Sequence, residues 1–205
     1  MKKFLILALV ALVLAPATAK AGPLAVGDLV KLSDWHNSNS GGPFWATSGS
    51  NGWLTFCVEA TEYIDFDHQF KVVGITDTAY NGGVGPAGDP LDPATAYLYD
   101  KYLGLADHTN TSVNNAYQAA IWYLEGEAGG VHNSLVTEAL GSGWTDIGNI
   151  RVVNLVWTVN SGSHKVGDRA QDILVRVPVP DGGATLTLLG FALVGVGMLR
   201  RRLGA

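Results

Sequence analysis

Residues 112–126, SVNNAYQAAIWYLEG, carry the clearest structural pattern in the chain. Their apolar side chains recur at intervals of three and four residues, which is the spacing of one face of a helix. A serine at the start and a glycine at the end are typical helix boundaries. The pattern predicts a helix whose apolar face consists of Val113, Tyr117, Ala120, Ile121 and Leu124, widened by Trp122.

Two further helical patterns lie on either side of this helix. Residues 92–105 begin with Asp92 and Pro93, an N-cap followed by a proline that suits the first helical turn. Residues 133–140 predict a third, shorter helix. The middle of the chain is therefore expected to be helical.

Strand patterns flank the helical region on both sides. β-Branched and aromatic residues predict strands over residues 52–60 (GWLTFCVEA), 70–76 (FKVVGIT), 150–159 and 173–177. Residues 37–52 and 80–89 predict surface loops. Strands on both sides of a helical insertion indicate a single α+β domain of antiparallel strands, with the first and last strands in one sheet. This domain is expected to span residues 22–178 of the 205.

The first 21 residues have the pattern of a secretory signal peptide. Lys2 and Lys3 precede an apolar run, and Ala19 and Ala21 form a small-x-small cleavage site for signal peptidase. The sequence therefore predicts an exported protein.

The last residues predict a membrane-spanning segment. An uncharged apolar run over residues 184–199 is followed at once by Arg200, Arg201 and Arg202. Arginine clusters mark the cytoplasmic end of such a helix. We expect the exported domain to face away from the cytoplasm while this helix holds it in the inner membrane.

Charge excludes one class of partner. Residues 22–180 hold 17 acidic and seven basic residues, a net charge of −10. Such a surface repels phosphate backbones, so a nucleic-acid-binding function is excluded.

A short motif precedes the apolar run, and it consists of Val179, Pro180, Asp181, Gly182 and Gly183. This motif, the apolar run and the arginine cluster together resemble the PEP-CTERM class of exosortase sorting signals, in its VPDSG variant, with Gly182 where serine is usual. The same tail, residues 179–205, is catalogued as the ice-binding protein C-terminal domain, a label that by itself implies no ice binding. The resemblance implies that an exosortase-type enzyme cuts near the motif and releases the domain to the cell surface, outer envelope or extracellular matrix. An ordinary single-span anchor is the alternative.

Two residues of the domain stand out chemically. Cys57 is the only cysteine, so in an oxidising compartment its thiol is either buried or used chemically. Strand alternation places it on the face of Glu59, opposite Phe56, and predicts that it looks toward a more polar side. Gln118 lies among large apolar residues of its helix, where a buried amide needs a hydrogen-bond partner.

The segments around these two residues, Phe56-Cys57-Val58-Glu59 and Tyr117-Gln118-Ala119-Ala120-Ile121-Trp122, resemble the signature of thioester domains in bacterial surface adhesins. The resemblance covers about residues 52–159, with Phe56 where tyrosine is frequent. It implies that the Cys57 sulfur replaces the Gln118 amide nitrogen, forming an internal thioester that acylates an amine on a target surface. Glu59 is then a candidate base for the thiol proton. Phe56, Tyr117 and Trp122 are candidate aromatic walls that exclude water.

Two alternatives remain open. Cys57 and Gln118 are purely structural in the first, and the domain is a non-covalent matrix or glycan-binding module, with Trp35, Trp45 and Trp53 as candidate sugar platforms. A secreted hydrolase is the second, with Glu125 and Glu127 as the first suspects, although a solvated helix cap is the expected role of both. No standard catalytic motif is present and the five histidines stand apart, so we expect no enzyme activity, no metal and no cofactor.

Overall fold

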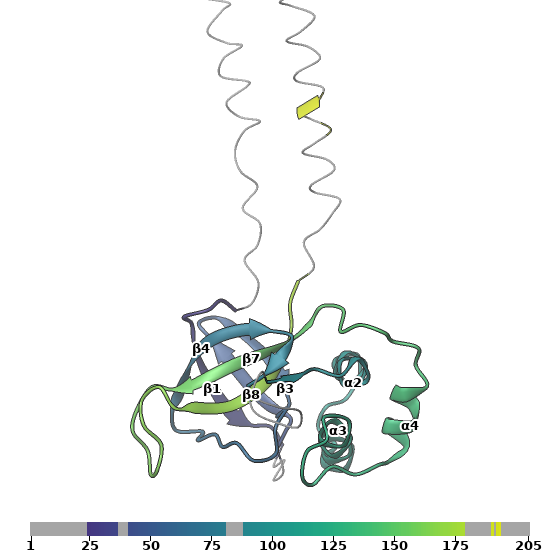
Figure 1. The fold of residues 1–205 in the computed structure, drawn as a ribbon, viewed down its shortest axis with the longest axis horizontal. Helices are drawn as coiled ribbons and strands as arrows, with labels where there is room; N and C mark the ends of the chain where they lie inside the picture. Colours follow the sequence, from purple (N-terminus) through teal and green to yellow (C-terminus); the bar gives the residue numbers. More distant parts are fainter. Residues whose placement is uncertain (1–23, 37–40, 81–87, 179–189, 191, 194–205) are drawn as a thin grey trace, which may run out of the picture. The chain divides into compact units, whose positions relative to one another are not determined.

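The computed structural model describes residues 24–36, 41–80, 88–178, 190, 192 and 193 (Figure 1). Gly22–Pro178 form one compact unit. The predicted signal peptide, sorting motif and arginine cluster lie outside the described residues, as does almost all of the apolar run. Among the described residues, no helix is long and apolar enough to span a membrane, so the structure does not confirm the predicted C-terminal helix.

Among the described residues, the main sheet has six strands and every neighbouring pair is antiparallel. Its spatial order is β3-β2-β1-β4-β7-β8. The strands are β1 (Leu29–Asp34), β2 (Phe44–Ser48), β3 (Asn51–Thr55), β4 (Gln69–Thr76), β7 (Ile150–Trp157) and β8 (Arg169–Arg176). Two short strands, β5 (Thr78–Ala79) and β6 (Asp89–Pro90), form a separate pair.

The two edge strands of the sheet are joined by the residues that follow β3. The Val58 N–H donates to the Asp172 carbonyl at 3.1 Å, and the Leu174 N–H donates to the Phe56 carbonyl at 3.3 Å. Residues 56–58 therefore continue β3 alongside β8 and roll the sheet onto itself (Figure 1). As expected from the sequence, the first and last predicted strands lie in one sheet.

Three helices pack against one another beside the sheet (Figure 1). They are α2 (Pro93–Leu103), α3 (Thr111–Leu124) and α4 (Ser134–Leu140), so all three predicted helices are present. The N-cap of α3 is Asn110 rather than Ser112, because the Asn110 side chain accepts a hydrogen bond from the Val113 N–H. The fold is α+β, as predicted.

Apolar residues form two clusters. One lies between the helices and the outer face of the rolled sheet, and it includes Phe56, Tyr99 and Ile121. The other is built from alternate residues of all the main strands except β3, and it includes Cys57 and Ile173. Since successive strand residues point to opposite faces, Phe56 and Cys57 enter different clusters.

Two strands of the main sheet differ from the sequence prediction, and the short strands β5 and β6 were not predicted either. Residues 44–48 were expected in a surface loop but form β2, with Phe44, Ala46 and Ser48 buried. The β1 strand was not predicted at all. Both strands acquire their hydrogen bonds by pairing with segments elsewhere in the chain, so local composition alone did not reveal them.

Candidate functional site

Cys57 and Gln118 are 61 residues apart in sequence and lie side by side. The Cys57 N–H donates to Gln118 Oε1 at 3.1 Å, and Gln118 Nε2 donates to the Cys57 carbonyl at 2.9 Å. Because Cys57 offers one backbone donor and one backbone acceptor, only one of the two flipped orientations of the Gln118 amide forms both hydrogen bonds. Both side chains are buried, with 4% and 1% of their surfaces exposed. The amide partner that Gln118 was expected to need is the backbone of Cys57.

A pair of glycines covers the Gln118 amide. Gly41 accepts a second hydrogen bond from the Cys57 N–H, at 3.0 Å. A Cβ at Gly42 would lie 2.9 Å from Gln118 Oε1 and 3.0 Å from a ring carbon of Phe56, and a Cβ at Gly41 would collide with the Trp122 ring. Sequence reasoning missed these glycines, although two adjacent glycines often mark a close approach of the backbone.

The surroundings of the Cys57 thiol correct one expectation. Cys57 packs in the apolar cluster of the sheet, so its surroundings are not wholly polar. Burial, together with the negative charges of Glu59 and Glu62, raises the pKa of the Cys57 thiol well above its usual value. The thiol is therefore neutral at pH 7, and any reaction through sulfur needs a proton acceptor.

Carboxyl groups that can accept the thiol proton include Glu59 and Glu62, whose charges act on Cys57. Carboxyl oxygens of Glu59, Glu62 and Asp172 all lie within 4.8 Å of one another, and Glu59 and Asp172 are buried. An acidic cluster does not by itself define a metal site, and oxygens this close are also able to share a proton. The sequence predicted Glu59 alone, because only the pairing of residues 56–58 with β8 brings Asp172 close to Glu59.

Hydrogen bonds from two backbone N–H groups and one side chain hold Asp172 in place. Its carboxyl accepts hydrogen bonds from the Tyr80 N–H at 2.7 Å, from Asn154 Nδ2 at 2.8 Å and from the Leu155 N–H at 3.3 Å. Burial raises the pKa of Asp172 to about 7, even though these donors lower it.

The aromatic residues predicted as walls of the site are buried or half-buried, and Phe56 and Tyr117 belong to a different apolar cluster from Cys57. The Phe56 and Tyr117 rings are stacked with centroids 6.5 Å apart, and both rings are buried. Tyr102, which was not predicted, packs edge-on to Phe56 at 4.7 Å and to Tyr117 at 5.1 Å. Trp122 is half-buried and lies against Gly41.

The side chains proposed for the alternative functions are partly or fully buried, and they pack against the apolar clusters or accept hydrogen bonds. Trp35, Trp45 and Trp53 are half-buried and pack against the apolar clusters. Glu125 is not a solvated cap: it is only 6% exposed, its Oε1 accepts from the Asp92 N–H at 3.2 Å, and burial raises its pKa to about 8. Glu127 Oε2 accepts from the Ala60 N–H, at 3.0 Å.

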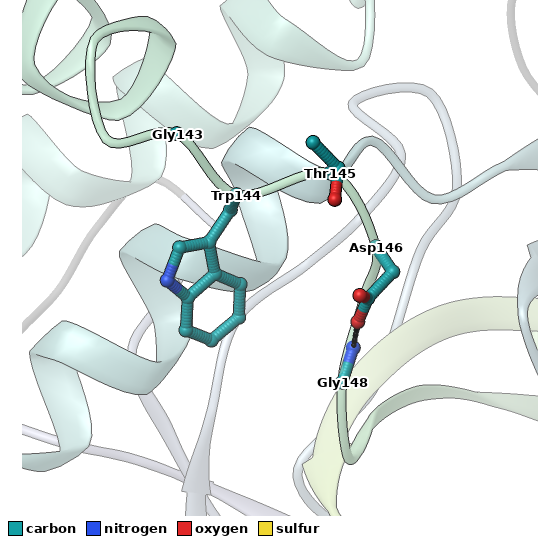
Figure 2. A pocket seen from close by; sticks show the side chains of 5 residues that line it. All are labelled: Gly143, Trp144, Thr145, Asp146 and Gly148. Atoms are coloured by element: carbon teal, nitrogen blue, oxygen red, sulfur yellow. Dashed lines mark hydrogen bonds between the residues drawn. The ribbon is translucent and has the colours of Figure 1, made fainter.

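A pocket of about 300 Å³ lies in the loop that follows α4 (Figure 2). It is lined by Gly143, Trp144, Thr145, Asp146 and Gly148. Asp146 Oδ1 accepts from the Gly148 N–H at 2.7 Å, and Trp144 is 38% exposed. None of the predicted site residues lines this pocket.

Comparisons with known proteins identify the tail. Residues 178–203 match the VPDSG-CTERM motif. No curated protein and no solved structure matches the chain. The motif supports an exported, envelope-associated protein that an exosortase-type enzyme processes, and no match supports the thioester-domain resemblance of the remaining residues.

Proposed function

We propose that this exosortase-sorted protein forms an internal thioester between Cys57 and Gln118 and uses it to attach covalently to amine-bearing surfaces. The observation that carries the proposal is the double hydrogen bond between the Gln118 amide and the Cys57 backbone. It holds the Gln118 amide against the backbone of the residue that carries the thiol, and both residues are buried.

Thioester formation requires the Cys57 sulfur to attack Gln118 Cδ. The Sγ–Cδ bond forms, the Cδ–Nε2 bond breaks and ammonia leaves, carrying the proton that the thiol loses. Negative charge develops on Oε1 in the tetrahedral intermediate. The Cys57 N–H already donates to this oxygen, so it stabilises that charge without further rearrangement.

The raised pKa of the thiol makes a base necessary. Glu59 is the proposed base, since its charge acts on Cys57 and its carboxyl is buried. The rings of Phe56 and Tyr117 limit the entry of water, which would otherwise hydrolyse the product. Attack by a surface amine on Cδ then yields one stable amide bond and a free thiol, so each molecule reacts once.

The test is the intact mass of the mature protein, before and after incubation with methylamine. A mass lower than that of the sequence by one ammonia is expected, followed by a gain of one methylamine. The Cys57→Ala variant serves as the control and should show the full mass and no adduct. A full-mass protein whose thiol titrates would refute the proposal.

A non-covalent matrix or glycan-binding protein is the second candidate. It is favoured by the fact that Gln118 already has hydrogen-bond partners without any cross-link, and by the exposed ring of Trp144 beside a pocket. In this case the unfolded protein has its full mass and one thiol, and Trp144→Ala weakens retention on immobilised polysaccharide.

A further inference from the structure

The Cys57 backbone carbonyl accepts a hydrogen bond from Gln118 Nε2, the nitrogen that thioester formation would remove. Residues 56–58 pair with β8 through the Phe56 carbonyl and the Val58 N–H, so the N–H and carbonyl of Cys57 point away from β8. The Cys57 N–H reaches Gly41 and Gln118 Oε1, and the carbonyl accepts from Gln118 Nε2. Among the described residues, Nε2 is the hydrogen-bond donor to this carbonyl.

Loss of ammonia removes that donor. Once the thioester forms, Nε2 is gone and the Cys57 carbonyl is left as a buried acceptor without its partner. A buried carbonyl without a donor is unfavourable, so any group that restores the hydrogen bond is favoured at that position. The vacated place lies directly beside the acyl carbon.

The incoming amine passes through the same kind of intermediate as the departing ammonia. In both steps Cδ is tetrahedral and carries an oxygen, a sulfur and a nitrogen. Gln118 Oε1 stays bonded to the Cys57 N–H, and the close approach of Gly42 leaves this oxygen little room to move. The nitrogen of the attacking amine therefore occupies the place that Nε2 left, next to the Cys57 carbonyl.

We propose that the Cys57 backbone carbonyl makes the thioester selective for primary over secondary amines; the inference rests on the proposed thioester. During attack the N–Cδ bond forms, the Cδ–Sγ bond breaks, and one amine proton passes to sulfur. A primary amine keeps a second N–H, which donates to the Cys57 carbonyl. A secondary amine has a single N–H, so it cannot both transfer its proton and keep this hydrogen bond.

The experiment compares ethylamine with dimethylamine on the mature, thioester-containing protein. These two amines are isomers, so their adducts have the same mass and their sizes are closely similar. The rate of mass gain is measured for each, and the ratio of rates is compared with that for a small alkyl thioester in the same buffer, which corrects for intrinsic reactivity. The protein is expected to favour ethylamine at least about tenfold more than the small thioester does.

Isopropylamine separates hydrogen bonding from steric exclusion, because it is branched at the reacting end but remains primary. It should react with the protein at a rate close to that of ethylamine, after the same correction. A protein ratio equal to that of the small thioester, or an isopropylamine rate as low as that of dimethylamine, overturns the inference while leaving the thioester intact. Absence of the initial loss of ammonia overturns the proposed function itself.

Discussion

At the scale of single residues, the proposed thioester chemistry depends on a neutral, buried thiol and a proton acceptor near it. The carboxylates that raise the pKa of Cys57 also provide places for its proton. A negative neighbour therefore does not activate the thiol by making it a thiolate in advance. It acts during the attack, when the proton must leave as the Sγ–Cδ bond forms.

Replacing the proposed base tests this role directly. Glu59→Gln keeps the shape of the side chain but removes its basicity, so thioester formation should slow by about 100-fold. The fraction of protein that has lost ammonia is followed by intact mass after synthesis in a cell-free system. Glu138→Gln is the matched control, because Glu138 is exposed and pairs with Lys101. An unchanged rate in Glu59→Gln, with a fold as stable as the wild type, would exclude Glu59 as the base.

At the scale of secondary structure elements, the site is assembled by contact between a strand continuation, a helix and a glycine pair. The continuation of β3 supplies Cys57 and the middle of α3 supplies Gln118. Gly41 and Gly42 lie over both, and both have φ values in the left-handed region that favours glycine, +89° and +141°. The geometry of the amide thus depends on a segment with no reactive side chain.

Gly42→Ala is the variant that tests this dependence. The added Cβ would push against Gln118 Oε1 and Phe56, so we expect a loss of about 1–3 kcal/mol in the free energy of unfolding and less complete thioester formation. Denaturant unfolding and intact mass measure the two effects. Gly49→Ala is the control, since Gly49 also has a positive φ but its Cβ would meet nothing within 4 Å. Equal effects of the two variants would mean that backbone strain, and not contact with the amide, is responsible.

At the scale of the whole molecule, buried carboxyl groups connect stability to pH. Burial raises the pKa of Glu125 to about 8 and that of Asp172 to about 7. In the unfolded chain both groups titrate near pH 4. Between about pH 4 and these higher values the folded protein binds more protons than the unfolded chain, so the free energy of unfolding falls as pH rises.

The whole domain should therefore be more stable at pH 5 than at pH 8. The decrease contributed by each group is at most about 1.4 kcal/mol per pH unit. Urea unfolding at a series of pH values measures it, and Glu125→Gln should flatten the profile. Glu138→Gln should not, because Glu138 is exposed and the Lys101 ammonium lowers its pKa. A wild-type profile that rises between pH 5 and pH 8 would contradict this expectation.

The sequence by itself determined the features that depend on neighbouring residues. The periodicity around Gln118 predicted α3, because helical packing repeats every three or four residues. The order of motif, apolar run and arginines predicted the sorting tail that the VPDSG-CTERM match supports. The single cysteine and one embedded glutamine each stood out in the sequence, and the resemblance to thioester domains made Cys57 and Gln118 a candidate pair.

Only the tertiary structure decided the features that depend on distant pairing. The β1 and β2 strands exist because they bond to each other and to β4 and β3. Asp172 joins Glu59 because residues 56–58 run along β8, and Glu125 is buried because α3 ends against the start of α2. Strand partners and burial are set by contacts between segments far apart in sequence, and no local pattern encodes which segments will meet.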